Sequence, residues 1–204
     1  AWIYPTGWGA ASFGRIFDKG HTTGWSTLVD NIDGNQTLLF FHGAASSSFS
    51  DWITNSGTIH LNRWQHIAVT FNKGAINNNP TVYINGASTG TTKLNSGTGS
   101  FLSDAAQTLF LGDSSAHTRN FDGDLDEMRM SNVIRSAGWI KTEYNNAENQ
   151  GTGSGKFIKT LWATEYLVPP NISTPAFTYV DNSSFTVNWT SGTQSMGFNL
   201  ANTT

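Results

Sequence analysis

The chain has 204 residues, a formal net charge of −3 and no cysteine. Its length suits one large β domain, or one domain with part of another. Only 12% of the residues are charged and no lysine or arginine cluster appears, so the electrostatic signature of a nucleic-acid-binding protein is missing. The absence of cysteine excludes a disulfide framework and a thiolate nucleophile. The sequence has no run of about 18 apolar residues, so it predicts no membrane-spanning helix.

Short strands with alternating side chains dominate the first half of the chain. They recur about every ten residues, with Gly, Asn and Ser between them, which is typical of a β-sandwich or jelly roll. The predicted strands cover residues 2–6, 14–20, 24–31, 37–43, 58–61, 64–72, 81–89 and 108–113.

Residues 64–72 show the clearest alternation, with the odd-numbered side chains on one face of the strand. On the other face, we expect His66 to be packed and hydrogen-bonded. A polar turn follows, and then Asn85-Gly86 predicts a tight hairpin, because both residues tolerate positive φ. This pattern indicates an antiparallel meander.

The region after residue 120 contains two more predicted strands, over residues 124–130 and 156–163, and one helix over residues 136–147. Ser136 is placed to cap that helix, which carries a short apolar stripe. One helix among about ten strands still indicates an all-β protein.

Three prolines between residues 167 and 176 cannot lie inside a sheet and predict a stiff linker. Beyond the linker, residues 177–204 contain one alternating stretch, residues 183–192, and are too few to close a domain. We therefore expect a sandwich over residues 1–166, a linker over 167–176 and a partial module over 177–204.

The series WQHIAVTFN, TVYINGAS, LFLGD and FDGDLDEMRMSNVIRSAGWIKTEYNN resembles the laminin-G-like, concanavalin A-like jelly-roll domains of bacterial and archaeal surface proteins. This resemblance implies an all-β, two-sheet antiparallel sandwich that lacks one strand ahead of AWIYP. It also implies a non-catalytic module that binds glycans or proteins, often with a structural calcium ion. The stretch SSFTVNWTSG resembles the opening of a fibronectin type III-like domain.

The stretch FDGDLDEMRM, residues 121–130, concentrates four carboxylates in a chain with few charges. An EF-hand loop counted from Asp122 is excluded, because Glu127 stands where that loop needs Gly and Val133 where it needs Glu. The resemblance instead makes Asp126 a candidate calcium ligand, assisted by Asp124 and Asp122. The alternative is that these acids are solvated residues at the end of a strand.

Catalysis by the same stretch needs two carboxylates on one face of the strand. Glucanases of the resembling fold carry a Glu-x-Asp-x-(x)-Glu strand. Here Asp124 replaces the first Glu, Met128 occupies the place of the second, and alternation turns Glu127 to the opposite face. The histidines lie in different segments and no Gly-x-Ser-x-Gly elbow occurs. We therefore predict no catalytic residues and no enzyme; a glycoside hydrolase is the least favoured function.

Sugar binding usually needs an exposed aromatic ring beside amide or carboxylate groups. Tryptophans in Gly- and Ser-rich stretches are the predicted platform, although each could instead close the end of the core. We expect Trp2, Trp64 and Trp139 to be core residues. The candidate ligand-binding residues are Trp8, Trp25, Trp52, Asp51, Asn55, His117 and Asn120.

Taken with the resemblance, these patterns favour a secreted or cell-surface binding or adhesion module whose partner is a glycan or a cell-surface protein. Calcium is the one cofactor expected. The alternative is a structural spacer or assembly module of a surface protein or filament, in which residues 177–204 pair with another chain to form a homo-oligomer.

Overall fold

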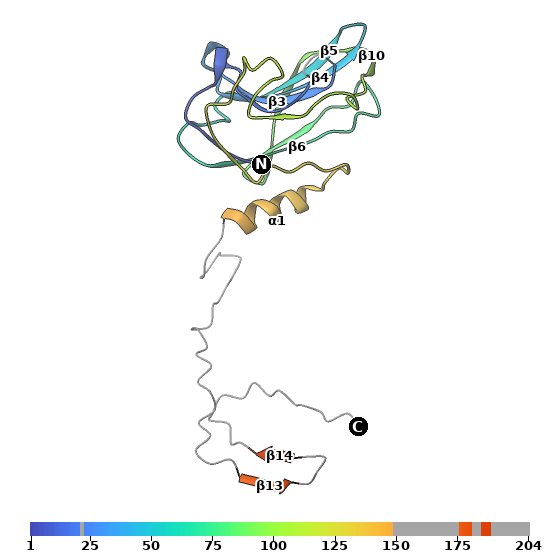
Figure 1. Ribbon diagram of the computed structural model, residues 1–204. Helices are drawn as coiled ribbons and strands as arrows, with labels where there is room; N and C mark the ends of the chain where they lie inside the picture. Colours follow the sequence, from blue (N-terminus) through green and yellow to red (C-terminus); the bar gives the residue numbers. More distant parts are fainter. Residues whose placement is uncertain (21–22, 149–175, 181–184, 189–204) are drawn as a thin grey trace.

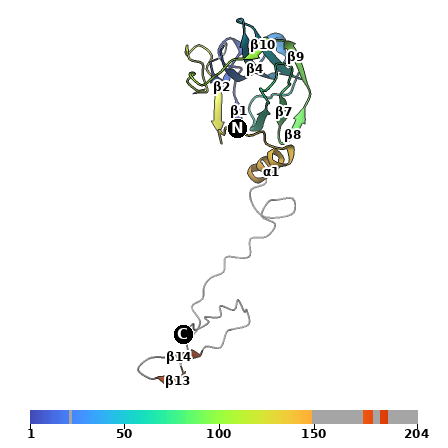
Figure 2. The ribbon, with the colours of Figure 1, turned by 90° about the vertical axis from the view of Figure 1, so that its right-hand side faces the viewer.

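The computed structural model describes residues 1–20, 23–148, 176–180 and 185–188. Two antiparallel sheets pack face to face, and the helix α1 (Ala137–Glu148) lies outside them (Figures 1 and 2). Two short 3-10 turns, Ala10–Ser12 and Ile32–Gly34, connect strands. The predicted all-β jelly-roll sandwich with one short helix is confirmed.

The larger sheet has the strand order β11-β2-β3-β4-β5-β9, and β10 pairs with β4. Its strands are β2 (Arg15–Lys19), β3 (Trp25–Asp30), β4 (Thr37–Ala45), β5 (Phe49–Thr54), β9 (Thr91–Asn95), β10 (Thr98–Phe101) and β11 (Phe110–Leu111).

The smaller sheet has the strand order β12-β1-β6-β7-β8. Its strands are β1 (Trp2–Pro5), β6 (Gln65–Thr70), β7 (Thr81–Ile84), β8 (Ala87–Thr89) and β12 (Gly123–Asp126). Two further strands, β13 (Ala176–Val180) and β14 (Phe185–Asn188), pair with each other in antiparallel fashion.

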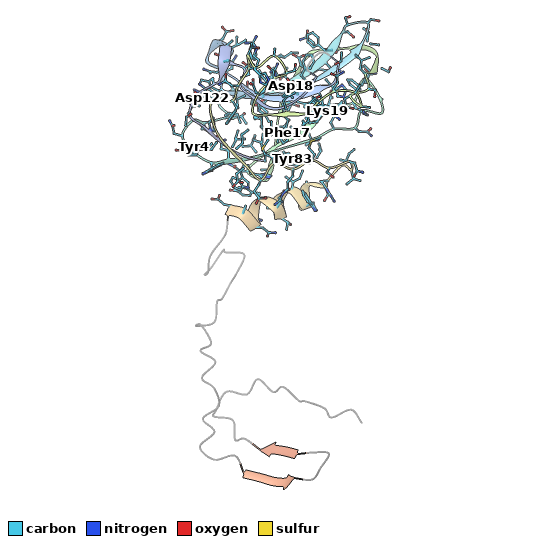
Figure 3. All side chains as sticks on the ribbon, viewed as in Figure 1. Tyr4, Phe17, Asp18, Lys19, Tyr83 and Asp122 are labelled. Atoms are coloured by element: carbon cyan, nitrogen blue, oxygen red, sulfur yellow. The ribbon has the colours of Figure 1, made fainter. Side chains whose placement is uncertain are left out.

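The core lies between the inner faces of the two sheets and includes Phe17, which is labelled in Figure 3. Both sheets contribute alternate residues, as period-2 sequences require. Each fully buried aliphatic side chain contributes about 1.5–3 kcal/mol to folding. The central cluster comprises Ile3, Ile16, Phe17, Val29, Leu38, Ile59, Ile67, Val82 and Phe121.

The helix α1 packs on the outer face of the smaller sheet, next to β8 (Figures 1 and 2). The Ser136 hydroxyl accepts a hydrogen bond from the Trp139 N–H at 3.2 Å, which confirms the predicted cap. Ile140 is fully buried, and the ring of Tyr144 stacks on Trp2 at 5.6 Å. Because of this helix, β6 is covered on both faces, and His66 is buried as predicted.

The predicted hairpin and meander are confirmed. Ile84 pairs with Ala87 across a two-residue loop in which Asn85 and Gly86 have φ values of 51° and 75°. The Asn85 side chain also accepts a hydrogen bond from the His66 N–H at 2.9 Å, which ties the loop back to β6.

Three strands of the larger sheet were not predicted: β5, β9 and β10. Their sequences are rich in Ser, Thr, Asn and Gly, which favour turns over strands when neighbouring strands are not considered. The predicted strand over residues 58–61 is wrong, because these residues form a turn-rich connection. Ile59 is nevertheless fully buried. Its apolar side chain therefore reflects packing in the core and does not indicate a strand.

Trp2 is buried as predicted, but the expectation for Trp64 and Trp139 is wrong. Trp64 is 44% exposed at the start of β6 and packs against the Tyr4 ring at 5.6 Å. Trp139 is also exposed and lies under the Arg135 guanidinium at 4.7 Å. Both rings lie on polar-flanked surface, where Trp often keeps one face in water.

The predicted strand over residues 156–163 lies outside the described residues, as does nearly all of the predicted linker over 167–176. β14 falls within the alternating stretch 183–192, in agreement with a strand there. Within the described part of the chain, no helix has the length and apolar character needed to cross a membrane.

Candidate ligand-binding groove

Asp124 and Asp126 lie on β12, which pairs with β1 through Tyr4 and Trp2. Both carboxylates are exposed on the outer face of the sheet, whereas Leu125 between them packs against the core cluster. β12 ends at Asp126, whose carboxylate accepts the N–H of the next residue at 2.7 Å. The strand therefore ends four residues before the end of the predicted stretch 124–130.

The chain turns at Glu127, which has a φ of 51°. Met128 consequently packs against the core cluster and does not continue the face of Asp124 and Asp126, which corrects the predicted alternation. The Glu127 carboxylate forms an ion pair with Arg129, and Arg129 also reaches Glu143 at 2.6 Å. Met128, and not an acid, stands where the glucanase pattern places its second catalytic carboxylate.

Asp122 precedes β12 and closes a loop. Its carboxylate accepts a hydrogen bond from the Thr6 hydroxyl at 3.0 Å, and its backbone carbonyl accepts one from the Thr6 N–H at 2.9 Å. In the described ranges, no group of three His, Cys, Asp or Glu side chains is placed to hold a metal ion. Calcium takes six to eight oxygens, so Asp124 and Asp126 offer two exposed carboxylates and not a complete ligand set.

The three candidate tryptophans do not meet in one site. Trp52 is only 1% exposed; it lies in β5, faces the core and donates its indole N–H to Asn79 at 2.8 Å, so its assignment to a ligand platform is wrong. Trp8 is half-buried against the core cluster. Trp25 is half-buried and donates its indole N–H to Asp104 at 3.0 Å.

Asp104 connects its loop to β2, to β3 and to the segment that follows β6. Burial alone raises the pKa of a carboxyl group, but hydrogen bonds from Lys19, Lys73 and Trp25 outweigh it and hold the pKa of Asp104 well below its usual range. The ammonium groups of Lys19 and Lys73 each lie 3.2 Å from the carboxylate.

His117 and Asn120 belong to a loop next to β11. The exposed His117 ring lies 3.0 Å from the Asp113 carboxylate and packs edge-on against Phe110. The Asn120 backbone carbonyl accepts a hydrogen bond from the Ala10 N–H. Hydrogen bonding to the Ser114 N–H, and then to His117, keeps the pKa of Asp113 below its ordinary value. This loop is organised by its own contacts.

The remaining candidates, Asp51 and Asn55, line a groove of about 730 Å³ on the outer face of the larger sheet. We call it the outer-sheet groove. The strand register arranges its side chains in three cross-strand rows. The rows are Asp18–Ser26–Phe41–Asp51–Asn95, Arg15–Leu28–Leu39–Ile53–Thr92 and Asp30–Thr37.

The floor of the outer-sheet groove is apolar. Leu28, Leu39 and Phe41 form a small buried cluster. Phe49 stacks on Phe41 with ring centroids 4.7 Å apart and is itself 36% exposed at the edge of the groove. A ligand in the groove therefore meets one accessible aromatic ring supported by a second.

Polar groups flank this floor. The Asp51 carboxylate accepts a hydrogen bond from the Asn95 side-chain amide at 2.9 Å. The Asp30 carboxylate accepts one from the Ile32 backbone N–H at 2.8 Å. Burial raises the pKa of Asp30 above its ordinary value. At the far side, burial lowers the pKa of Arg15, whose partner Asp18 lies 3.0 Å away and opposes that shift.

The two carboxylates that line the groove are too far apart for glycoside hydrolysis. Asp30 pairs with Thr37, Asp51 pairs with Phe41, and β4 lies between their strands. Four residues along β4 and two strand spacings separate their Cα atoms by roughly 17 Å. The catalytic carboxyl groups of glycosidases lie about 5–9.5 Å apart. These two acids can bind a ligand but cannot act together as a catalytic pair.

Sequence reasoning missed most of the groove, including Arg15, Leu39, Phe41 and Phe49. One signal was present: TLLFFHG is apolar at consecutive positions, so β4 places apolar side chains on both faces. An antiparallel strand with one face in water normally alternates. Its outward Leu39 and Phe41 therefore indicate a covered or ligand-binding outer face.

The sandwich as a whole can be compared with known proteins. A search of curated proteins finds no match to the chain. A family model described as the concanavalin A-like lectin/glucanases superfamily matches residues 1–141, which include both sheets and the start of α1. With its two antiparallel sheets and this match over more than half of its length, the chain belongs to the concanavalin A-like lectin/glucanases superfamily.

Proposed function

We propose that the chain is a non-catalytic binding module that recognises glycan through the outer-sheet groove. One observation carries the proposal: the apolar row through Leu28, Leu39 and Ile53 lies between two rows that carry carboxylate, amide and hydroxyl groups. The accessible Phe49 ring, stacked on Phe41, lies at the edge of the groove beyond the Asp51 row. A sugar has the same two-sided chemistry, because its C–H face is apolar and its hydroxyl groups need hydrogen-bond partners.

The size of the groove supports this ligand class. About 730 Å³ falls within the range of 300–1,000 Å³ that is usual for small-molecule sites. In this arrangement Phe49 and Phe41 cover the apolar face of the sugar. Asp51, Asn55 and Arg15 then serve as hydrogen-bond partners around its edge.

A glycan array, screened with and without calcium, tests the ligand class, and calorimetry on any binder tests the site. Phe49→Ala is expected to weaken binding roughly tenfold, because it removes the exposed ring of the stacked pair. The matched control is Leu111→Ala, an exposed apolar residue outside the groove. An array without binders in either condition contradicts the proposal, as does an equal loss in both variants.

The proposed setting is a secreted or cell-surface protein, in which glycan binding serves adhesion. Laminin G-like domains are typically extracellular, and family membership supports this setting. Partition of the native protein between the cell interior, surface and medium, followed with an antibody, tests it. Recovery from the cell interior alone contradicts it.

A structural calcium ion held by Asp126 and Asp124 remains a proposal that rests on the family. The two carboxylates share one exposed face of β12, and backbone carbonyls or water have to supply the other oxygens. If calcium binds there, EDTA lowers the melting temperature, and Asp126→Asn abolishes the effect of EDTA. An identical melting temperature with EDTA and with calcium removes the claim.

A further inference from the structure

Two arginines lie side by side at the β2 end of the outer-sheet groove. Arg15 is the first residue of β2, and its backbone N–H donates a hydrogen bond to the Arg119 carbonyl at 2.9 Å. Both side chains line the groove. The tertiary structure therefore brings two guanidinium groups from distant parts of the chain to one end of the groove.

The Arg15 guanidinium is nearly buried, but most of its hydrogen-bond donors are unused. The residue is 5% exposed, and its Nε donates to the Asp18 carboxylate at 3.0 Å. Within the described residues, its two Nη groups have no hydrogen-bond partner, yet they are not fully enclosed by protein. Because Arg15 lines the groove, these donors reach its open space. Buried polar groups almost always have partners, so the Nη groups are free to bind a ligand.

Arg119 supplies a second guanidinium to the same end. It lies over the Phe13 ring, 5.4 Å from the centroid, and Phe13 packs against the apolar floor of the groove. This contact orients the guanidinium through its flat face and leaves the N–H groups at its edge free. Among the described side chains, none forms an ion pair with Arg119.

Only one of these two positive charges has a carboxylate partner among the described residues. Asp18 uses one oxygen for Arg15 and the other for a backbone N–H. Asp30 also binds a backbone N–H and forms no ion pair with either arginine. Burial is the main cause that lowers the pKa of Arg15, and the charge of Arg119 adds to it. A bound anion relieves this repulsion between like charges.

We propose that the β2 end of the outer-sheet groove binds the carboxylate of an acidic sugar, so that the recognised glycan contains a uronic acid. This inference rests on the glycan-binding function proposed above. A carboxylate is planar and accepts two parallel hydrogen bonds from the fork of a guanidinium group. The Arg15 Nη groups form a fixed fork, because the Asp18 contact holds the side chain in place. Arg119 adds a second, more exposed guanidinium.

The place of this carboxylate site sets a minimum length for the ligand. The accessible Phe49 ring lies on β5, and β2 is three strands away in the same sheet. Since strands lie about 4.8 Å apart, roughly 14 Å separates the two positions across the sheet. One sugar ring does not span this distance. The ligand is therefore an oligosaccharide, with its acidic sugar at β2 and another sugar on the stacked pair of Phe49 and Phe41.

Chemical reduction of the ligand tests the carboxylate without altering the protein. Calorimetry compares uronic-acid oligosaccharides with the same oligosaccharides after their carboxylates have been reduced to alcohols. Reduction removes the charge and keeps the sugar rings, so we expect the dissociation constant to rise at least ~10-fold. Equal affinity for the two forms overturns the inference and leaves glycan binding by the groove intact.

Arg119→Gln tests the exposed guanidinium. Glutamine removes the charge and keeps an amide donor, so we expect affinity for uronic-acid oligosaccharides to fall about tenfold. Affinity for the reduced forms is expected to change little. Arg15 is left in place, because its removal leaves the Asp18 carboxylate buried without a partner.

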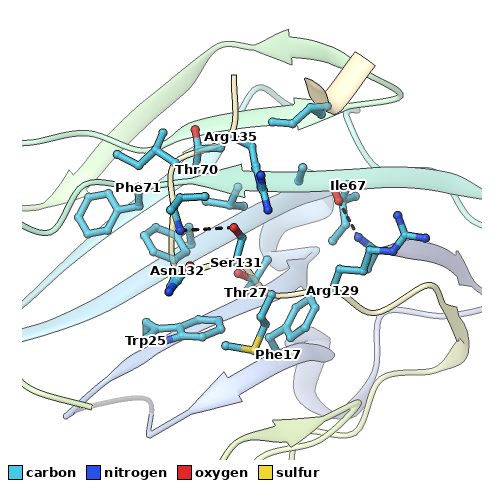
Figure 4. A pocket seen from close by; sticks show the side chains of 18 of the residues that line it. Phe17, Trp25, Thr27, Ile67, Thr70, Phe71, Arg129, Ser131, Asn132 and Arg135 are labelled. Carbon is cyan, nitrogen blue, oxygen red and sulfur yellow. Dashed lines mark hydrogen bonds between the residues drawn. The ribbon is translucent and has the colours of Figure 1, made fainter. Parts of the chain in front are cut away.

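The matched control is Arg135→Gln. Arg135 also lies over an aromatic ring, that of Trp139 at 4.7 Å, but it lines a separate cavity (Figure 4). The variant removes the same charge outside the groove, so we expect it to bind like the wild type. Circular dichroism and thermal unfolding confirm that both variants keep the sandwich.

Three further results overturn the inference alone. The first is an equal loss of affinity in Arg119→Gln and Arg135→Gln, which assigns the effect to overall charge. The second is tight binding of sulfated oligosaccharides without carboxylates at the affinity of the uronic acids. The third is an array on which only neutral glycans bind. An array without any binder contradicts the proposed function itself, and the inference with it.

Discussion

At the scale of single residues, His66 shows how burial changes chemistry. It was expected to be packed and hydrogen-bonded; the packing is confirmed, but Nδ1 has no hydrogen-bond partner among the described residues. Burial, followed by the positive charges of Ala1 and Arg129, lowers the pKa of His66 from 6.5 to about 4. The unfolded chain therefore binds a proton at a pH at which the folded chain does not.

This difference predicts a pH-dependent stability. The contribution of His66 is fully present above pH 6.5 and is lost as the pH falls to about 4, which amounts to about 3 kcal/mol for the shift given. Urea unfolding of the wild type and His66→Gln at pH 7 and pH 4.5 measures it. We expect the wild type to lose more stability than the variant over this range. Parallel pH profiles contradict the prediction.

The structure brings only some of the predicted site residues together. Asp51 and Asn55 line the outer-sheet groove, so sequence reasoning reached part of it. Trp52 was predicted to be exposed because the polar residues of FSDWIT are typical of a loop. In the structure this segment forms β5, which pairs with β4 on one side and β9 on the other, and its local sequence does not predict these pairings. The exposure of a tryptophan depends on which face of a strand it occupies. That face can be assigned only after the strand itself has been identified.

At the scale of elements, the β7–β8 hairpin and α1 depend on each other. Gly86 has a φ of 75°, and a Cβ added there meets the Tyr144 ring at 2.9 Å. Asn85-Gly86 was predicted from its turn chemistry alone, and that prediction is confirmed. The close approach of the helix gives Gly86 a second role that the dipeptide does not reveal.

Gly86→Ala therefore combines backbone strain with a steric clash, and we expect it to lower the free energy of unfolding by about 2–4 kcal/mol. Gly57→Ala is the matched control, since Gly57 has a φ of 73° and open space around it. That variant is expected to cost about 1 kcal/mol. Urea unfolding compares them, and equal losses contradict the steric part of the argument.

The helix offers a second matched pair. Ile140 is 1% exposed, whereas its neighbour Trp139 is 41% exposed. Ile140→Ala is expected to cost about 2–5 kcal/mol through the cavity it leaves, and Trp139→Ala under about 1.5 kcal/mol. Thermal and urea unfolding measure both. A larger loss for Trp139→Ala shows that α1 docks through a different face.

At the scale of the whole molecule, the sandwich forms a unit within residues 1–148. In the described part of the chain, β13 and β14 pair only with each other. The predicted domain boundary at residue 166 remains a prediction, because residues 149–175 are not described.

A chain that ends at Tyr166 tests this boundary. We expect its melting temperature to lie within about 3 °C of that of the full chain, a shift that corresponds to about 1 kcal/mol at this size. A large drop places residues 167–204 inside the cooperative unit of the sandwich.

The sequence by itself determined the all-β class, the antiparallel meander, the tight hairpin and the capped helix, because alternation, turn chemistry and capping act within a few residues. It also excluded an EF-hand. Only the tertiary structure decided that β12 stops at Asp126, that Met128 turns inward and that Trp52 is buried while Trp64 is exposed. The outer-sheet groove likewise arises from pairings between distant segments. Burial and strand register depend on partners far away in the chain, and no local pattern specifies those partners.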